Sequence, residues 1–237
     1  MTMTLETIRA AHARIAPYIV QTPLLRLPAL DDALGCEVYV KAECMQRTGA
    51  FKLRGAMNKI LALTDAERAR GFVAASSGNH GRAVAYAAQR FGTHACIVMP
   101  RTAPPVKALA PRVRVFGAEP AALPRYTESL RAGHPVRVEQ KRSVADALVA
   151  QMPGDVCFPY VAANTDGFAP VADDDILRGM KLLLLEGKLL CEPSSAIGIG
   201  AVLRGQLPVH KGDKVCFVIS GGSVALEQLH RLEDVRL

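Results

Sequence analysis

Two short apolar segments flank an Ala-rich, helix-like segment in the first half of the chain, and this order restricts the possible folds. Residues 71–77 and 94–100 are the apolar segments, and residues 82–91 lie between them. Two strands joined through a helix are parallel neighbours in one sheet, because such a crossover brings the second strand back in the same direction. The chain is therefore expected to be an α/β protein with helices on the faces of parallel sheets.

The same reasoning extends to the rest of the chain. Periodicity and composition predict further helices and strands, the helices over 5–17, 51–63, 174–185 and 194–204, and the strands over 37–43, 112–117 and 214–219. The connection 101–111 is proline-rich and too short for a crossover helix. The chain therefore passes from one predicted strand to the next without the usual intervening helix.

Composition narrows the functional classes. The chain has 237 residues, half of them apolar and 22% charged, which is enough for one large or two small domains with real cores. Its net charge of +7 suits anionic small molecules. The basic residues are scattered, and the chain has no Trp and only five Tyr, so nucleic acid is not an expected partner.

Cysteine usage and hydropathy indicate a cytoplasmic protein. The six cysteines lie far apart without a Cys-x-x-Cys pair, and we interpret them as buried small hydrophobes in a reducing compartment rather than disulfide partners or zinc ligands. The N-terminal residues carry an early acid and lack an apolar signal core. The longest apolar run, 180–190, is interrupted by charges and too short to cross a bilayer, so no membrane association is expected.

Three turns that follow predicted strands hold the candidate catalytic and binding residues, since ligands of α/β sheets bind at the carboxyl ends of strands. Residues 48–56 place Lys52 at the start of a helix beside Phe51, residues 76–81 read Ser-Ser-Gly-Asn-His-Gly, and residues 220–222 read Ser-Gly-Gly. A partly desolvated lysine has a lowered pKa and can form a Schiff base. A solvated lysine in a first helical turn is the alternative.

The other two turns also have two interpretations each. Residues 76–81 form a nest of N–H donors that suits a carboxylate, or they simply cap the helix that follows. The Ser220 hydroxyl is placed where it could meet a ring nitrogen, or it is an ordinary turn residue. None of the three turns alone decides between its alternatives.

Together, and in this order, the turns resemble the fold-type II pyridoxal-phosphate enzymes, in the threonine/serine dehydratase and serine racemase branch. The matching segments cover nearly the whole chain: 21–24, 41–43 with Gln46, 48–58, 76–81, 115–120, 192–194 and 220–222. The resemblance implies pyridoxal 5'-phosphate as the cofactor and a tryptophan-synthase-β-like fold of parallel sheets with flanking helices. The sequence of residues 76–81, with its histidine, is similar to the corresponding turn of dehydratases rather than to that of cysteine synthases.

The resemblance also implies roles for single residues. Lys52 would bind the cofactor as a Schiff base and later move the substrate's α-proton, and Ser77 matches the opposite-face acid of racemases. Phe51 would pack beside the cofactor ring, Asn79 would bond the ring hydroxyl, and Ser220 would meet the pyridine nitrogen.

The substrate carboxylate is expected to bind in the 76–81 turn. By the same resemblance its contacts would be Ser76, Ser77, Gly78 and His80. Glu192 would either contact the residues that bind the cofactor and substrate or have a purely structural role. The substrate partner would be a small amino acid, and the resemblance implies a homo-oligomer, most simply a dimer.

The sequence departs from the family pattern by an apparent internal deletion. The family's glycine-rich loop, which wraps the cofactor phosphate, is absent, because no three consecutive glycines occur in this chain. The loop would lie between the strands 94–100 and 112–117, and the missing stretch would hold on the order of 80 residues at roughly 30 per βαβ unit. The implied domains are therefore incomplete: a large cofactor-binding domain of 1–47 and 110–237, and a small domain of 48–109.

Four single positions also differ from the family pattern. Ala50 replaces a serine near the phosphate, Ala147 replaces a glycine, and Ser223 replaces an asparagine. Arg125 lies close to the place of the acidic residue that completes the cation site of racemases, so no metal is predicted.

The resemblance implies an enzyme of amino-acid metabolism, a pyridoxal-phosphate-dependent ammonia-lyase. It would convert L-threonine or L-serine to a 2-oxo acid and ammonia by β-elimination. Two alternatives stay open: a catalytically impaired or inactive remnant of the family, because the phosphate loop is missing, and a serine or aspartate racemase or hydroxyaspartate ammonia-lyase on the same scaffold. Product analysis separates the members of this second alternative.

Overall fold

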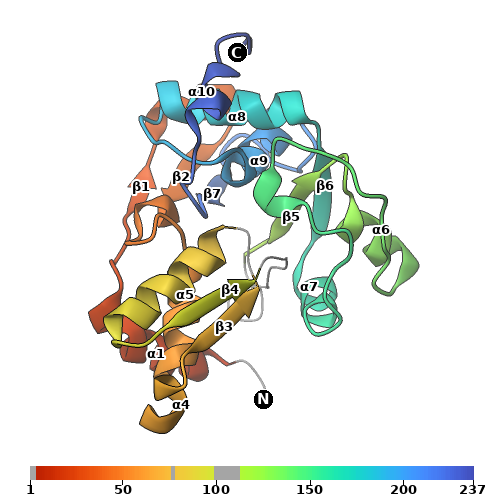
Figure 1. Cartoon of the computed structure of the whole chain (residues 1–237). Coiled ribbons are helices and arrows are strands. Elements are labelled where there is room, and N and C mark those ends of the chain that lie inside the picture. The colour runs from red at the N-terminus through yellow and green to blue at the C-terminus, as the bar shows by residue number, and fades with distance from the viewer. Residues whose placement is uncertain (1–3, 76–77, 99–112) are drawn as a thin grey trace.

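The computed structural model describes residues 4–75, 78–98 and 113–237 (Figure 1). Helices and strands alternate along the described chain in the order α1 (Leu5–Ile15), β1 (Leu24–Arg26), α2 (Asp31–Leu34), β2 (Glu37–Lys41), α3 (Lys52–Leu61), α4 (Asp65–Ala69), β3 (Phe72–Ala75), α5 (Asn79–Arg90), β4 (Ala95–Val98), β5 (Phe116–Pro120), α6 (Arg125–Ala132), α7 (Phe158–Asn164), β6 (Gly167–Val171), α8 (Asp173–Leu185), α9 (Pro193–Leu203), β7 (Lys214–Val218) and α10 (Leu226–His230).

The described strands form three small sheets. The first has the order β1-β2-β7, with β2 and β7 parallel and β1 antiparallel to β2. β3 pairs in parallel with β4, and β5 pairs in parallel with β6. The predicted α/β class with parallel pairing is confirmed. Figure 1 shows the three sheets in separate regions of the molecule, with β3 and β4 on the opposite side from α8 and α9.

The largest core lies between the β1-β2-β7 sheet and the helices α8 and α9. Its fully buried side chains include Leu30, Val38, Leu183 and Ile199. α8 and α9 approach so closely that a Cβ on Gly200 would lie 2.4 Å from the main-chain oxygen of Asp175. The position of α9, whose first turn reaches the candidate site, therefore depends on backbone-to-backbone packing.

A second core joins α1, α3, α5 and β3. Ile15 of α1 packs here with Leu53 and Met57 of α3. Leu5 and Ile8 of the same helix are 44% and 38% exposed, since only the end of α1 reaches the core. This core fixes the start of α3, and the division into two domains stays a prediction.

The cysteines are free thiols, but they are not all buried. Cys36 and Cys191 are buried, whereas Cys96 of β4 and Cys216 of β7 are exposed. Successive side chains of a strand point to opposite faces, and on β7 Phe217 takes the buried face. The expectation of six buried cysteines is therefore wrong for Cys96 and Cys216, and Cys44 and Cys157 are only partly buried. Among the described helices, none combines the length and apolar character needed to cross a bilayer.

Candidate active site

Backbone hydrogen bonds hold the turn before α3 against the turn after β7. Ala50 forms an isolated antiparallel bridge with Gly221. The Phe51 N–H donates to the Ser220 carbonyl at 3.0 Å, and the Gly222 N–H donates to the Gly49 carbonyl at 2.9 Å. Two of the three turns singled out in the sequence are therefore in direct contact, although about 170 positions separate them.

Lys52 is the first residue of α3 and is partly buried at this junction. Its Nζ lies 4.9 Å from the centroid of the Phe51 ring. Burial lowers the pKa of the Lys52 amine, against the opposing effects of Glu192 and Cys157. A lysine with a lowered pKa is neutral more often, and the neutral amine is the form that attacks a carbonyl carbon.

Asn79, the first residue of α5, bonds Glu192 and Ser223, which lie next to the turn after β7. Its Nδ2 donates to Oε1 and to Oε2 of Glu192, both at 3.1 Å. The Ser223 hydroxyl donates to Asn79 Oδ1 at 2.7 Å, and the Ser223 N–H donates to Glu192 Oε2 at 3.3 Å. Both ends of the Asn79 amide therefore have partners, which fixes its orientation.

Glu192 is 4% exposed. Burial raises the pKa of its carboxyl group, although the hydrogen bond from Asn79 acts in the opposite direction. Gly221 passes so close to this pair that a Cβ would lie 2.7 Å from Asn79 Nδ2 and from both Glu192 carboxylate oxygens. The absence of a side chain at Gly221 is what gives the Asn79–Glu192 pair its space.

Ser220 contacts a residue that sequence reasoning did not single out. Its Oγ lies 2.9 Å from the Oγ of Ser195, and Ser195 Oγ also accepts a hydrogen bond from the Gly221 N–H at 2.9 Å. Ser195 belongs to the first turn of α9 and is 7% exposed. Only its place in the run Glu-Pro-Ser-Ser could have pointed to it.

The remaining predicted site residues lie at or before the start of α5. Gly78 precedes the helix and is exposed, and His80 is partly buried. Burial lowers the pKa of the His80 imidazole, and the positive charge of Lys52 lowers it further, so the ring is neutral at pH 7. Ser76 and Ser77 lie outside the described residues.

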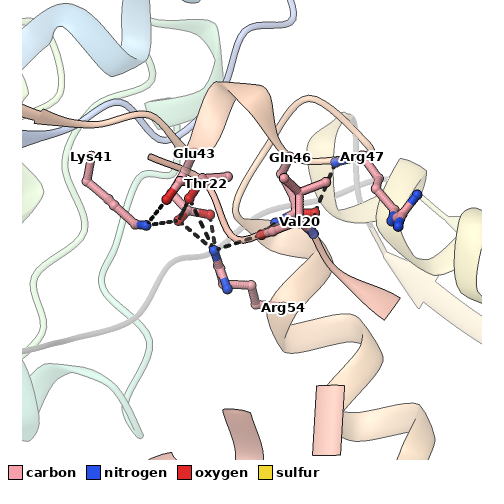
Figure 2. A network of polar contacts seen from close by, with 7 residues as sticks. All are labelled: Val20, Thr22, Lys41, Glu43, Gln46, Arg47 and Arg54. Atoms are coloured by element: carbon pink, nitrogen blue, oxygen red, sulfur yellow. Dashed lines mark hydrogen bonds and ion pairs between the residues drawn. The ribbon is translucent and has the colours of Figure 1, made fainter. Parts of the chain in front are cut away.

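An ion pair between Arg54 of α3 and the buried Glu43 fixes the start of α3 (Figure 2). Arg54, two residues after Lys52, donates from Nε to Glu43 Oε2 and from Nη2 to Glu43 Oε1, both at 2.9 Å. The Thr22 hydroxyl donates to Glu43 Oε1 at 2.7 Å, and Lys41 Nζ lies 3.8 Å from the same oxygen. A two-point Arg–carboxylate contact fixes direction as well as distance, so Glu43 orients the first turn of α3.

Gln46 ties the chain just before the lysine turn to the segment around Val20 (Figure 2). Its Oε1 accepts from the Val20 N–H at 2.8 Å, and its Nε2 donates to the Val20 carbonyl at 2.9 Å. Glu43 and Gln46 both lie in segments that carry the family resemblance, but these contacts were not predicted. Their signal in the sequence is a charge and an amide in the short segment between β2 and α3.

Glu119 precedes Arg125, the residue close to the place of the missing acidic residue of the racemase cation site, and is 1% exposed. Its carboxylate accepts from the N–H groups of Tyr126 and Thr127 at 2.9 and 2.7 Å and from the Thr127 hydroxyl at 2.8 Å. Burial raises the pKa of the Glu119 carboxyl group, although the hydrogen bonds from Tyr126 and Thr127 and the charge of Arg125 act in the opposite direction. Within the described ranges, no group of three His, Cys, Asp or Glu could hold a metal ion. The absence of a metal site stays a prediction.

The three turns fit the ring end of pyridoxal phosphate. They bring together a desolvated primary amine at Lys52, an oriented amide at Asn79, and a hydroxyl at Ser220, and Gly221 leaves space beside the amide. The phosphate end is different, because the sequence has no glycine-rich loop to surround it. Arg101 and Lys107 of the proline-rich connection, and Arg112 directly after it, lie outside the described residues.

The family comparison agrees with this site. The family model described as "Pyridoxal-phosphate dependent enzyme" matches residues 15–112 and 105–221, so the chain belongs to this family of pyridoxal-phosphate-dependent enzymes. The match consists of two pieces that overlap at 105–112, in and next to the proline-rich connection. Fold-type II architecture, pyridoxal phosphate as the cofactor and a shortened chain are confirmed.

The names of the individual relatives refer to different reactions. The chain is similar to the L-threonine ammonia-lyase of Thermotoga maritima, with 31% identity over 314 aligned positions that cover 97% of this chain and 78% of the relative. It is 30% identical to a serine racemase of Oryza sativa subsp. indica (94% of this chain, 91% of the relative). It is 27% identical to the L-threo-3-hydroxyaspartate ammonia-lyase of Saccharomyces cerevisiae, covering 92% of each.

Solved structures that resemble this protein also include both a lyase and a racemase. The structure superimposes on a threonine deaminase from T.th. with a TM-score of 0.85 and 31% identity, covering 94% of this chain and 99% of that one. It superimposes on maize serine racemase with a TM-score of 0.86 and 27% identity, covering 98% of each. Both lyases and racemases are therefore close in fold.

Proposed function

We propose that this protein is an ammonia-lyase that converts L-threonine or L-serine to a 2-oxo acid and ammonia. The observation that carries the proposal is the junction of the three turns, where a desolvated Lys52 lies beside Ser220 and the Asn79–Glu192 pair. The similarity to the Thermotoga L-threonine ammonia-lyase supports this reaction.

Each residue has a part in the proposed reaction. When bound, pyridoxal phosphate supplies an electron sink for the bonds broken at the substrate's α- and β-carbons. Lys52 Nζ holds the cofactor and then accepts the α-proton, a task that its lowered pKa favours. Asn79 and Ser220 orient the ring, and Phe51 covers one side of it. The β-hydroxyl would leave with a proton as water, and the released enamine would react with a water molecule to give the 2-oxo acid and ammonia.

The substrate carboxylate belongs, in this proposal, to the turn before α5. Ser76, Ser77, Gly78 and His80 would bind it, and Ser77 matches the opposite-face acid of racemases. A neutral His80 adds no positive charge beside the Lys52 amine, so it does not oppose protonation of that amine during the reaction. The proposal also includes a cytoplasmic homodimer with the two-domain division given above.

Two other functions have specific support. A serine racemase and a hydroxyaspartate ammonia-lyase are also among the similar proteins, at 30% and 27% identity. An inactive remnant of the family is favoured by the missing glycine-rich loop, without which the cofactor phosphate lacks its backbone N–H donors.

Titration of the purified protein with pyridoxal phosphate tests cofactor binding. We expect a visible absorption band that borohydride reduction converts to a stable label on Lys52, located by peptide mapping. Lys52→Ala should abolish the label, whereas Lys59→Ala, an exposed lysine of the same helix, should keep it. A label on another residue, or no band at saturating cofactor, would contradict the proposal and favour the remnant.

Product analysis then separates the reactions. L-Threonine, L-serine and threo-3-hydroxyaspartate are supplied in turn, and ammonia, 2-oxo acid and the D-amino acid are measured. Release of 2-oxo acid and ammonia from threonine or serine supports the proposal. D-Serine as the main product, or activity on hydroxyaspartate alone, assigns the chain to one of the alternatives.

A further inference from the structure

We propose that Ser195 is a positioning residue that sets the direction of the Ser220 O–H bond, so that Ser220 acts as a hydrogen-bond donor toward the cofactor ring. This inference rests on the proposed function, because it requires pyridoxal phosphate to bind with its ring nitrogen at Ser220. It adds a residue, Ser195, that touches neither the cofactor nor the substrate and acts through its neighbour.

Three atoms define the arrangement. Ser195 Oγ accepts a hydrogen bond from the Gly221 N–H at 2.9 Å and lies 2.9 Å from Ser220 Oγ. Gly221 is held in turn by its bridge to Ala50, at the turn that carries Lys52. The acceptor role of Ser195 is therefore set by a backbone group that cannot turn away.

Hydrogen-bond satisfaction decides which hydroxyl is the donor. If Ser220 donated to Ser195, the Ser195 hydrogen would need another acceptor, and in the described part of the chain its hydroxyl has hydrogen-bond contacts only with Gly221 N and Ser220 Oγ. Ser195 is 7% exposed, so a hydroxyl hydrogen without a hydrogen-bond acceptor is unfavourable there. If Ser195 donates to Ser220, its hydrogen has an acceptor and its oxygen still accepts from the Gly221 N–H.

Cooperativity acts in the same direction. A hydroxyl oxygen that already accepts a hydrogen bond becomes a stronger donor through its own hydrogen, and the Gly221 N–H polarises Ser195 in this way. The Ser220 oxygen then accepts from Ser195, and its hydrogen is left to point away from Ser195. A hydroxyl presented as a donor favours an unprotonated ring nitrogen, because a protonated one would offer a second hydrogen to it.

The structure provides a matched control in the neighbouring residue. Ser194 is 5% exposed, lies in the same turn of α9, and its Oγ accepts from the Ala147 N–H at 3.0 Å. Ser194→Ala and Ser195→Ala therefore each remove one buried hydroxyl and one hydrogen bond to a backbone N–H. Only Ser195→Ala removes the contact with Ser220.

The test compares these variants by titration with pyridoxal phosphate, reading the dissociation constant and the pH at which the visible band changes. We expect Ser195→Ala to bind about threefold to tenfold more weakly, which is the loss of one hydrogen bond, and to shift the pH midpoint of the band. Ser194→Ala should match the wild type. Ser195→Cys, which keeps the volume with only a weak donor, should shift the midpoint in the same direction if Ser195→Ala folds poorly.

A double-mutant cycle identifies the route of the effect. If Ser195 acts through Ser220, adding Ser195→Ala to Ser220→Ala should change neither the affinity nor the midpoint further. Equal behaviour of Ser195→Ala and Ser194→Ala, or additive effects in the double variant, would overturn the inference while leaving the proposed function intact. A wild-type protein without the band would overturn both.

Discussion

Asn79 and Glu192, which are 113 positions apart in the sequence, meet through the Asn79 amide nitrogen and both Glu192 carboxylate oxygens at 3.1 Å. The contact joins the first residue of α5 to the residue preceding α9, and Ser223 bonds both partners. It is the polar link between the two helix starts that border the candidate site, so its protonation state influences both stability and the orientation of Asn79.

Replacing Glu192 should change how stability depends on pH. The folded pKa of Glu192 is raised by burial, so its carboxyl group binds a proton more readily in the folded than in the unfolded chain. Its contribution is therefore most favourable below the unfolded pKa and is lost as the pH rises through the folded pKa. We expect Glu192→Gln to flatten this decline by on the order of 1 kcal/mol between pH 4 and 8.

The measurement is the free energy of urea unfolding at several pH values. Glu186→Gln removes an exposed carboxyl at the end of α8 and serves as the control, with a profile parallel to the wild type. A Glu192→Gln profile parallel to the wild type as well would show that burial does not perturb Glu192.

Glu43 should give a pH dependence of the opposite sign. Burial acts to raise the pKa of Glu43, but the hydrogen bonds from Arg54 and Thr22 outweigh it, so the folded pKa is lowered. The stabilisation is present above the unfolded pKa, about 4.3, and is lost as the pH falls through the folded value. Glu43→Gln should destabilise by roughly 1–3 kcal/mol at pH 7 and by clearly less near pH 3. A difference that stays constant from pH 7 to 3 would contradict an ionised Glu43.

Gly221→Ala should disturb the site more than the fold. The added Cβ would lie 2.7 Å from side-chain atoms of Asn79 and Glu192, which must move apart. We expect a destabilisation of about 1–3 kcal/mol and a clear loss of pyridoxal-phosphate affinity. Gly55→Ala, in the exposed middle of α3 with no atom within 4 Å of the new Cβ, should instead stabilise by up to about 1 kcal/mol. Calorimetry and cofactor titration of both variants check this, and unchanged affinity in Gly221→Ala would refute it.

Two buried threonines should respond oppositely to the same substitution. Thr22 is 2% exposed, donates to Glu43 and accepts from Arg54, whereas the Thr48 hydroxyl is buried without a hydrogen-bond partner in the described part of the chain. Valine has nearly the same shape as threonine. Thr22→Val should therefore destabilise by about 1–3 kcal/mol, and Thr48→Val should be neutral or slightly stabilising. Chemical denaturation of both is the measurement, and similar losses would mean that Thr48 has a partner.

Local patterns predicted most of the secondary structure because they depend on neighbouring residues. The helix predicted over 174–185 is observed as Asp173–Leu185, and the strand predicted over 214–219 as Lys214–Val218. The strand predicted over 112–117 was misplaced, since β5 runs from Phe116 to Pro120. Its register is decided by pairing with β6, in which Phe116 lies opposite Gly167, and no local pattern contains that partner.

The sequence by itself determined the family, the cofactor and the three turns, because these depend on residue types in a fixed order along the chain. Tertiary structure alone decided which groups meet: Asn79 with Glu192, Arg54 with Glu43, and Ser195 with Ser220. It also decided that burial lowers the pKa of Lys52. Desolvation and hydrogen-bond direction arise from segments that are distant in sequence and packed together, so a linear pattern does not encode them locally.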